Sequence, residues 1–174
     1  MSVSEELLDV VDENDRVIAI RTRGEIHALG LMHRAVHILV FNSRGELFLQ
    51  KRSMLKDENP GLWDTSAAGH VDSGEDYYDC ARREIGEELG IYENVDLEEL
   101  FKLPPSATTG YEHSLIYATV YDGVMTLQAE EIDDGQWVTA EAMDARVDAG
   151  DPEFTDNLFL IWRGYRELRH KSAL

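Results

Sequence analysis

Residues 69–91 read GHVDSGEDYYDCARREIGEELGI, and this segment contains the strongest local signals in the chain. We predict a helix over residues 74–89, with Ser73 as its N-cap and Gly90 just beyond its C-terminus. Acidic side chains crowd the first turn, where the helix dipole favours negative charge. An apolar stripe along the helix is expected to face a sheet. It consists of Tyr78, Ala81, Ile85 and Leu89.

Three glutamates, Glu84, Glu87 and Glu88, lie three and four residues apart, on one face of the predicted helix within an arc of roughly 100°. Carboxylates this close repel one another, and an ordinary surface helix more often alternates charges of opposite sign. A divalent cation would relieve the repulsion, because hard ions such as Mg²⁺ take oxygen ligands. The three residues alone leave two interpretations open, a cation site and a solvated acidic face.

The chain as a whole predicts one domain, because 174 residues suffice for a single sizeable core. Its 35 acidic and 16 basic residues give a net charge of −19, which argues against a nucleic-acid polymer as partner. The N-terminus lacks the apolar region of a signal peptide, and no apolar run has membrane-spanning length. A single cysteine, Cys80, fits a reducing compartment and is expected to be a buried structural thiol. We therefore expect a cytoplasmic protein with no membrane partner.

Strands and helices intermingle along the rest of the chain. The predicted strands are residues 7–21 (two strands joined by a turn at 12–15), 33–41, 46–52, 97–103, 115–121 and 136–138. The other predicted helices are residues 25–29, 139–149 and 155–169. This order lacks a regular βαβ alternation, so it favours a mixed sheet with helices packed on it over a doubly wound parallel fold.

The segment 69–91 resembles the Nudix box, Gly-x5-Glu-x7-Arg-Glu-U-x-Glu-Glu-x-Gly-U with U aliphatic, at every fixed position. The resemblance implies a single Nudix hydrolase domain over residues 1–174, of the α/β class. This domain would be an α/β/α sandwich with a mixed sheet and a loop–helix–loop metal site that binds Mg²⁺ or Mn²⁺. Residues 1–32 would add a strand pair and a short helix packed on it.

The resemblance also implies roles for the residues of the box. Its metal ligands would be Glu84, Glu87, Glu88 and the backbone carbonyl of Ala68. Its structural residues would be Gly69, Glu75, Arg83 and Gly90, with Glu75 and Arg83 forming an ion pair that holds the loop against the helix.

A further carboxylate is expected outside the box. Other family members often supply one from a loop shortly before a Trp-containing strand. Here Glu131 stands six residues before Trp137, and Glu130 is the second choice. We therefore expect Glu131 to be an additional metal ligand or a catalytic group.

The implied reaction is hydrolysis of a diphosphate bond in a small substrate, such as a nucleoside diphosphate derivative, by metal-activated water that attacks phosphorus. A carboxylate would accept the proton of that water, and Glu84 and Glu131 are both candidates for this catalytic role. The box indicates the type of bond and not the group attached to it. Substrate identity and a homodimeric state are therefore left open.

The flanks of the box resemble the family branch that contains isopentenyl-diphosphate isomerase, in residues 9–21, 30–35, 50–53 and 60–64. That isomerase has a catalytic cysteine directly before its Gly-His pair, where this chain has Ala68, which cannot donate or accept a proton. It also binds metal partly through histidines at positions that His33 and His70 match, and we interpret these two as substrate-pocket residues. The hydrolase is preferred, and a divergent isomerase is the alternative.

A non-catalytic nucleotide-binding regulator on the same fold is a second alternative. Such a domain would not need an activated water and would be expected to lose glutamates of the box, whereas this chain retains them all. The retained box therefore favours an enzyme.

Contacts to the substrate depend on few residues, because basic side chains are scarce. Lys51, Arg52 and Arg34 are candidate phosphate contacts, with charge balance against nearby carboxylates as the alternative. Tyr111, in the loop 103–113, is expected to stack on a base.

Overall fold

The computed structural model describes residues 2–173, and its central strand is β3 (His33–Phe41). Eight of the nine β3 residues are buried, a pattern typical of a strand covered on both faces. β3 pairs in parallel with β8 (Glu112–Val120) and antiparallel with β6 (Ala67–His70) and β4 (Leu47–Arg52). The sheet is completed by β5 (Trp63–Asp64) and β9 (Ile132–Val138) beside β4, and by β7 (Glu98–Leu103) beside β8.

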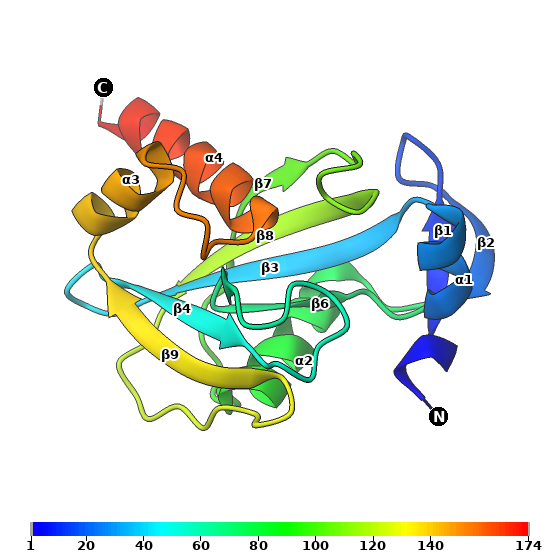
Figure 1. Ribbon diagram of the computed structural model, residues 1–174, viewed down its shortest axis with the longest axis horizontal. Coiled ribbons are helices and arrows are strands. Elements are labelled where there is room, and N and C mark those ends of the chain that lie inside the picture. The colour runs from blue at the N-terminus through cyan, green and yellow to red at the C-terminus, as the bar shows by residue number, and fades with distance from the viewer. Residues whose placement is uncertain (1, 174) are drawn as a thin grey trace.

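Helices cover both faces of this mixed sheet (Figure 1). One face carries α2 (Tyr77–Leu89), and the other carries α3 (Ala140–Asp148) and α4 (Asp156–Ser172). Alternate residues of β3 enter the two apolar clusters: Val36 and Ile38 pack with α2, whereas Leu39 packs with α4. The predicted α/β/α sandwich with a mixed sheet is confirmed.

The N-terminal segment forms a separate two-stranded sheet (Figure 1). Its elements are η1 (Val3–Glu5), β1 (Leu7–Val11), β2 (Val17–Thr22) and α1 (Arg23–Leu29). The predicted hairpin and short helix are confirmed, although α1 begins earlier than predicted, because Thr22 and Glu25 form a capping box. The turn of the hairpin is fastened to β3 by an ion pair from Arg34 Nε to Asp15 Oδ1 at 2.6 Å.

Helix α2 begins later than predicted, at Tyr77. Its N-cap is Asp76, whose side chain accepts a hydrogen bond from the backbone N–H of Asp79. Ser73, the predicted cap, instead donates its hydroxyl to Asp9 of β1 at 2.7 Å. A tertiary contact thus overrides the local capping preference.

The predicted apolar stripe of α2 is correct in three of its four members. Ala81, Ile85 and Leu89 are fully buried against the sheet, whereas Tyr78 is 46% exposed. Cys80 is a buried free thiol, as predicted, and burial raises its pKa well above the ordinary value. No helix within residues 2–173 is long and apolar enough to cross a membrane.

Candidate metal centre and catalytic site

The glutamates of the box lie where α2 approaches β6, and Gly69 makes this approach possible. A Cβ atom added to Gly69 would lie 2.0 Å from Oε1 of Glu84, inside van der Waals contact. The carboxylate of Glu84 therefore occupies the space that any larger residue at position 69 would need.

Arg83 organises the outer part of the cluster. Its Nε donates to Glu75 Oε1 at 2.9 Å and its Nη2 to Glu75 Oε2 at 3.0 Å, so the predicted ion pair is present in bidentate form. The same guanidinium reaches Glu84 Oε1 at 2.7 Å and the backbone carbonyl of His70 at 3.1 Å. Glu87 lies further out, with its side chain 57% exposed and 3.4 Å from Arg83. The Arg83 guanidinium thus links the segment before α2, through Glu75 and the His70 carbonyl, to Glu84 and Glu87 on the helix.

Glu88 is held differently, by neutral donors only. Its side chain is buried, Oε1 accepts the backbone N–H of Ala68 at 2.9 Å, and Oε2 accepts Nε2 of Gln50 at 3.0 Å. Within residues 2–173, no salt bridge to Glu88 is formed. Its negative charge therefore has no direct cationic partner.

Burial and mutual repulsion favour protonated carboxyls in this cluster when no cation is bound. Burial, together with the charge of Glu88, raises the pKa of Glu84 to about 8, although Arg83 opposes the change. Burial raises the pKa of Glu88 to about 7, against the hydrogen bonds from Ala68 and Gln50. A divalent cation would displace these protons and supply the missing positive charge, so the donor set fits a hard metal ion.

Glu131, the predicted carboxylate outside the box, is near enough to Glu88 for its charge to help raise the pKa of Glu88. The loop before β9 is attached to the end of α2 by a hydrogen bond from the Gln128 N–H to the Glu88 carbonyl at 3.0 Å. The ammonium group of Lys56 forms an ion pair with Glu131. Lys56 was not predicted, since it stands in the loop between β4 and β5 at no motif spacing. Glu130 is exposed.

Within residues 2–173, the predicted phosphate contacts form no ion pair with the glutamates of the box. Lys51 Nζ lies 5.9 Å from the centre of the Trp63 ring. Trp63 belongs to the apolar cluster on the face of the sheet opposite α2. Arg52 is bound to Asp64 at 3.4 Å, and Arg34 is bound to the hairpin turn. Tyr111 is 41% exposed and packs beside Gly30.

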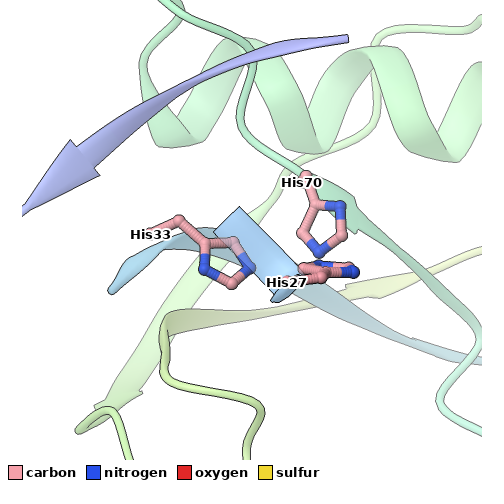
Figure 2. A group of neighbouring side chains, drawn as sticks. All are labelled: His27, His33 and His70. Carbon is pink, nitrogen blue, oxygen red and sulfur yellow. The ribbon is translucent and has the colours of Figure 1, made fainter. Parts of the chain in front are cut away.

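His33 and His70 form a second polar cluster together with His27, which was not predicted (Figure 2). The three imidazoles come from β3, β6 and α1, and one nitrogen of each lies within 4.8 Å of the others. Glu112 joins them, with Oε1 at 3.0 Å from His70 Nε2 and 3.6 Å from His33 Nε2. Burial alone would raise the pKa of Glu112, but the two imidazoles hold it well below its ordinary value. This set of donors could hold a transition-metal ion.

The histidines and the glutamates lie on opposite faces of β6. Gly69 faces Glu84, and because successive side chains of a strand alternate, His70 and Ala68 point to the other face. His33 is fully buried. The interpretation of His33 and His70 as substrate-pocket residues stays a prediction, and both side chains lie on the face of β6 opposite the carboxylates of the box.

Comparisons with known proteins agree with this architecture. The model of the NUDIX domain matches residues 31–158. An uncharacterised Nudix hydrolase of Yersinia pestis is 38% identical over 148 residues, which are 85% of this chain and 81% of that protein. A crystal structure of a Deinococcus radiodurans protein has 32% identity and a TM-score of 0.81, covering 91% of this chain and 98% of that one. The chain belongs to the Nudix hydrolase family.

Within that family, the comparisons also include a relative of the isomerase branch. Isopentenyl-diphosphate Delta-isomerase 2 of Photorhabdus laumondii is 33% identical over 137 residues, which are 77% of each chain. The resemblance of the chain to that branch is thereby confirmed.

Proposed function

We propose that this Nudix hydrolase cleaves a diphosphate bond in a small nucleoside diphosphate derivative, with Mg²⁺ or Mn²⁺ as cofactor. The observation that supports this proposal best is the pair of half-buried Glu84 and buried Glu88, whose pKa values are both raised by burial and by neighbouring carboxylates. Such a pair binds a hard divalent cation in preference to two protons near neutral pH.

The chain's own residues would divide the work as follows. The proposed metal ligands are Glu84, Glu87, Glu88, the carbonyl of Ala68, and Glu131. A metal ion bound there would neutralise the diphosphate and lower the pKa of a coordinated water. Glu84 or Glu131 would accept the proton of the attacking water. Arg83 and Glu75 would fix the loop, so that the carboxylates keep their positions.

The substrate and the bond cleaved can be identified in one experiment. The purified protein is incubated with a panel of nucleoside diphosphates, nucleotide sugars, dinucleotides and isoprenoid diphosphates in ¹⁸O-labelled water, with Mg²⁺, with Mn²⁺ and with chelator. We expect metal-dependent cleavage of at least one nucleoside diphosphate derivative, with the label on one phosphorus. Absence of turnover on the whole panel by a folded, metal-loaded protein would contradict the proposal.

Variants of the carboxylates test the assignment of roles. Glu88→Gln and Glu87→Gln should each lower turnover at least ~10²-fold, through loss of charge that stabilises the transition state. Full activity in both would overturn the metal site. Glu131→Gln should also lower turnover, whereas Glu130→Gln, one residue away on an exposed position, is the matched control.

The cluster of His27, His33, His70 and Glu112 favours a second candidate, a divergent isopentenyl-diphosphate isomerase, since that branch binds metal partly through histidines. Ala68 weighs against it, because a methyl group stands on the histidine face where the isomerase has its cysteine. Incubation with isopentenyl diphosphate, followed by NMR detection of the allylic product, decides between the two. The variant Ala68→Cys provides the more sensitive form of this test.

We also propose a cytoplasmic location and leave a homodimer open. Cell fractionation and sedimentation of the purified protein, respectively, test these two predictions.

A further inference from the structure

We propose that Gln50 is a positioning residue, which fixes Glu88 for metal binding without neutralising its charge. This inference rests on the proposed function, because it concerns the same metal site. Gln50 lies on β4, where its side chain points towards α2 and is buried. Gln50 lies outside the Nudix box, which spans residues 69–91.

The hydrogen bonds of Gln50 determine the orientation of its amide. Nε2 donates to Glu88 Oε2 at 3.0 Å and to the backbone carbonyl of Ser66 at 3.2 Å. A rotation of the amide by 180° would place its oxygen against two acceptors, which is unfavourable. Only one orientation of Gln50 therefore satisfies both partners.

The second partner of Gln50 is itself fixed. Ser66 is fully buried, its hydroxyl donates to the carbonyl of Phe48 at 2.5 Å, and it accepts the backbone N–H of Val40 at 2.8 Å. The carbonyl of Ser66 is thus held by strands β3 and β4. Gln50 transmits this rigid position to the carboxylate of Glu88.

Gln50 and Ala68 together hold both oxygens of Glu88, one donor on each. Each carboxylate oxygen has a further lone pair available, so these hydrogen bonds restrict rotation of Glu88 and leave it able to bind a cation. A lysine at position 50 would instead form an ion pair with Glu88 and compete with the metal. The neutral amide therefore suits a carboxylate whose charge is needed by an incoming ion.

The test measures Mn²⁺ binding to the whole metal-free protein by electron paramagnetic resonance, without substrate. Gln50→Leu removes both hydrogen bonds and should weaken Mn²⁺ affinity by about 10- to 100-fold, the usual effect of losing a partner of a metal ligand. Gln50→Lys should weaken it at least as much. The control is Gln136→Leu, the same change on β9, where the paired residue Leu49 belongs to the opposite face; its affinity should be unchanged.

A parallel Glu88→Gln arm separates this proposal from the proposed function. If Glu88→Gln weakens Mn²⁺ binding and Gln50→Leu does not, the role of Gln50 is refuted while the metal site stands. If neither variant weakens binding, the metal site itself is refuted, and with it the role of Gln50.

A measurement on the unmodified protein covers the case in which both Gln50 variants fail to fold. In a Mg²⁺ titration followed by NMR, the assigned side-chain amide of Gln50 should shift together with the amide N–H of Ala68. An unshifted Gln50 amide at saturating Mg²⁺ would overturn the proposal.

Discussion

Glu88→Gln also tests whether an unpaired buried carboxylate makes the metal-free fold sensitive to pH. Burial raises the pKa of Glu88 to about 7, from an ordinary value of 4.5. Since the folded state holds this proton more tightly than the unfolded chain does, the stabilisation is complete below pH 4.5 and is lost as the pH rises through 7. At about 1.4 kcal/mol per pKa unit, the difference between the two values corresponds to a loss of about 3 kcal/mol.

The substitution also has a cost that does not depend on pH. A glutamine amide at position 88 has one oxygen, so it cannot accept from both Ala68 and Gln50, as the two oxygens of Glu88 can in either protonation state. One donor is left facing an NH₂ group, which costs about 1–3 kcal/mol. The absolute stability of the variant at pH 5 should therefore fall. The diagnostic quantity is the change in stability between pH 5 and pH 8, which should be smaller than in the wild type by about 2.5 kcal/mol, the part of the full loss that falls within this pH window.

The assay is urea unfolding at several pH values from 5 to 8 in the presence of a chelator. Groups that titrate elsewhere in the molecule contribute equally to both proteins, so the difference between the two curves isolates the glutamate cluster. Glu130→Gln is the control, because this residue is exposed and lies outside the cluster, and it should keep the wild-type dependence on pH. Identical curves for the wild type and Glu88→Gln, apart from a constant offset, would refute the reasoning.

Three other substitutions address the geometry around the cluster. Gly69→Ala places a Cβ atom 2.0 Å from Oε1 of Glu84 and should lower turnover on the order of 10²-fold, with an unchanged circular dichroism spectrum. Arg83→Ala leaves Glu75 unpaired and should lower the free energy of unfolding at pH 7 by about 1–3 kcal/mol in urea. Burial alone would raise the pKa of Glu75 but Arg83 lowers it overall, so this loss should disappear as the pH falls through the lowered pKa. Asp76→Ala removes the cap of α2 and should cost about 1 kcal/mol in the same assay.

The part of the site that could be predicted from the sequence is the part encoded locally. Glu84, Glu87 and Glu88 share a helix face because of their spacing, and the pairing of Glu75 with Arg83 follows from the box. The layers of the fold follow from the mixed order of strands and helices. These features depend on residues near one another in the chain.

The unpredicted part depends on pairings between distant segments. Gln50 reaches Glu88 only because β4 lies beside the loop that leads into β6. Lys56 reaches Glu131 because β9 pairs with β4, which brings together the loop after β4 and the loop before β9. The short strands β5 and β6 were missed because two and four residues contain no detectable periodicity. His27 was missed because α1 approaches β3 and β6 only in the folded chain.

Strand alternation along β6 explains why the two polar clusters can be tested separately. The register pairs Val36 with Gly69 and Ala35 with His70, and a shift of one residue would exchange the faces of β6. In the observed register, Gly69 faces the glutamates, whereas His70 and Ala68 face the histidines. A change at Ala68 therefore alters the chemistry of the imidazole face and leaves the side chains of the carboxylate cluster in place. If Ala68→Cys gains isomerase activity while diphosphate hydrolysis persists, the two chemistries belong to opposite faces of one strand; if hydrolysis is lost with it, both reactions depend on a shared site.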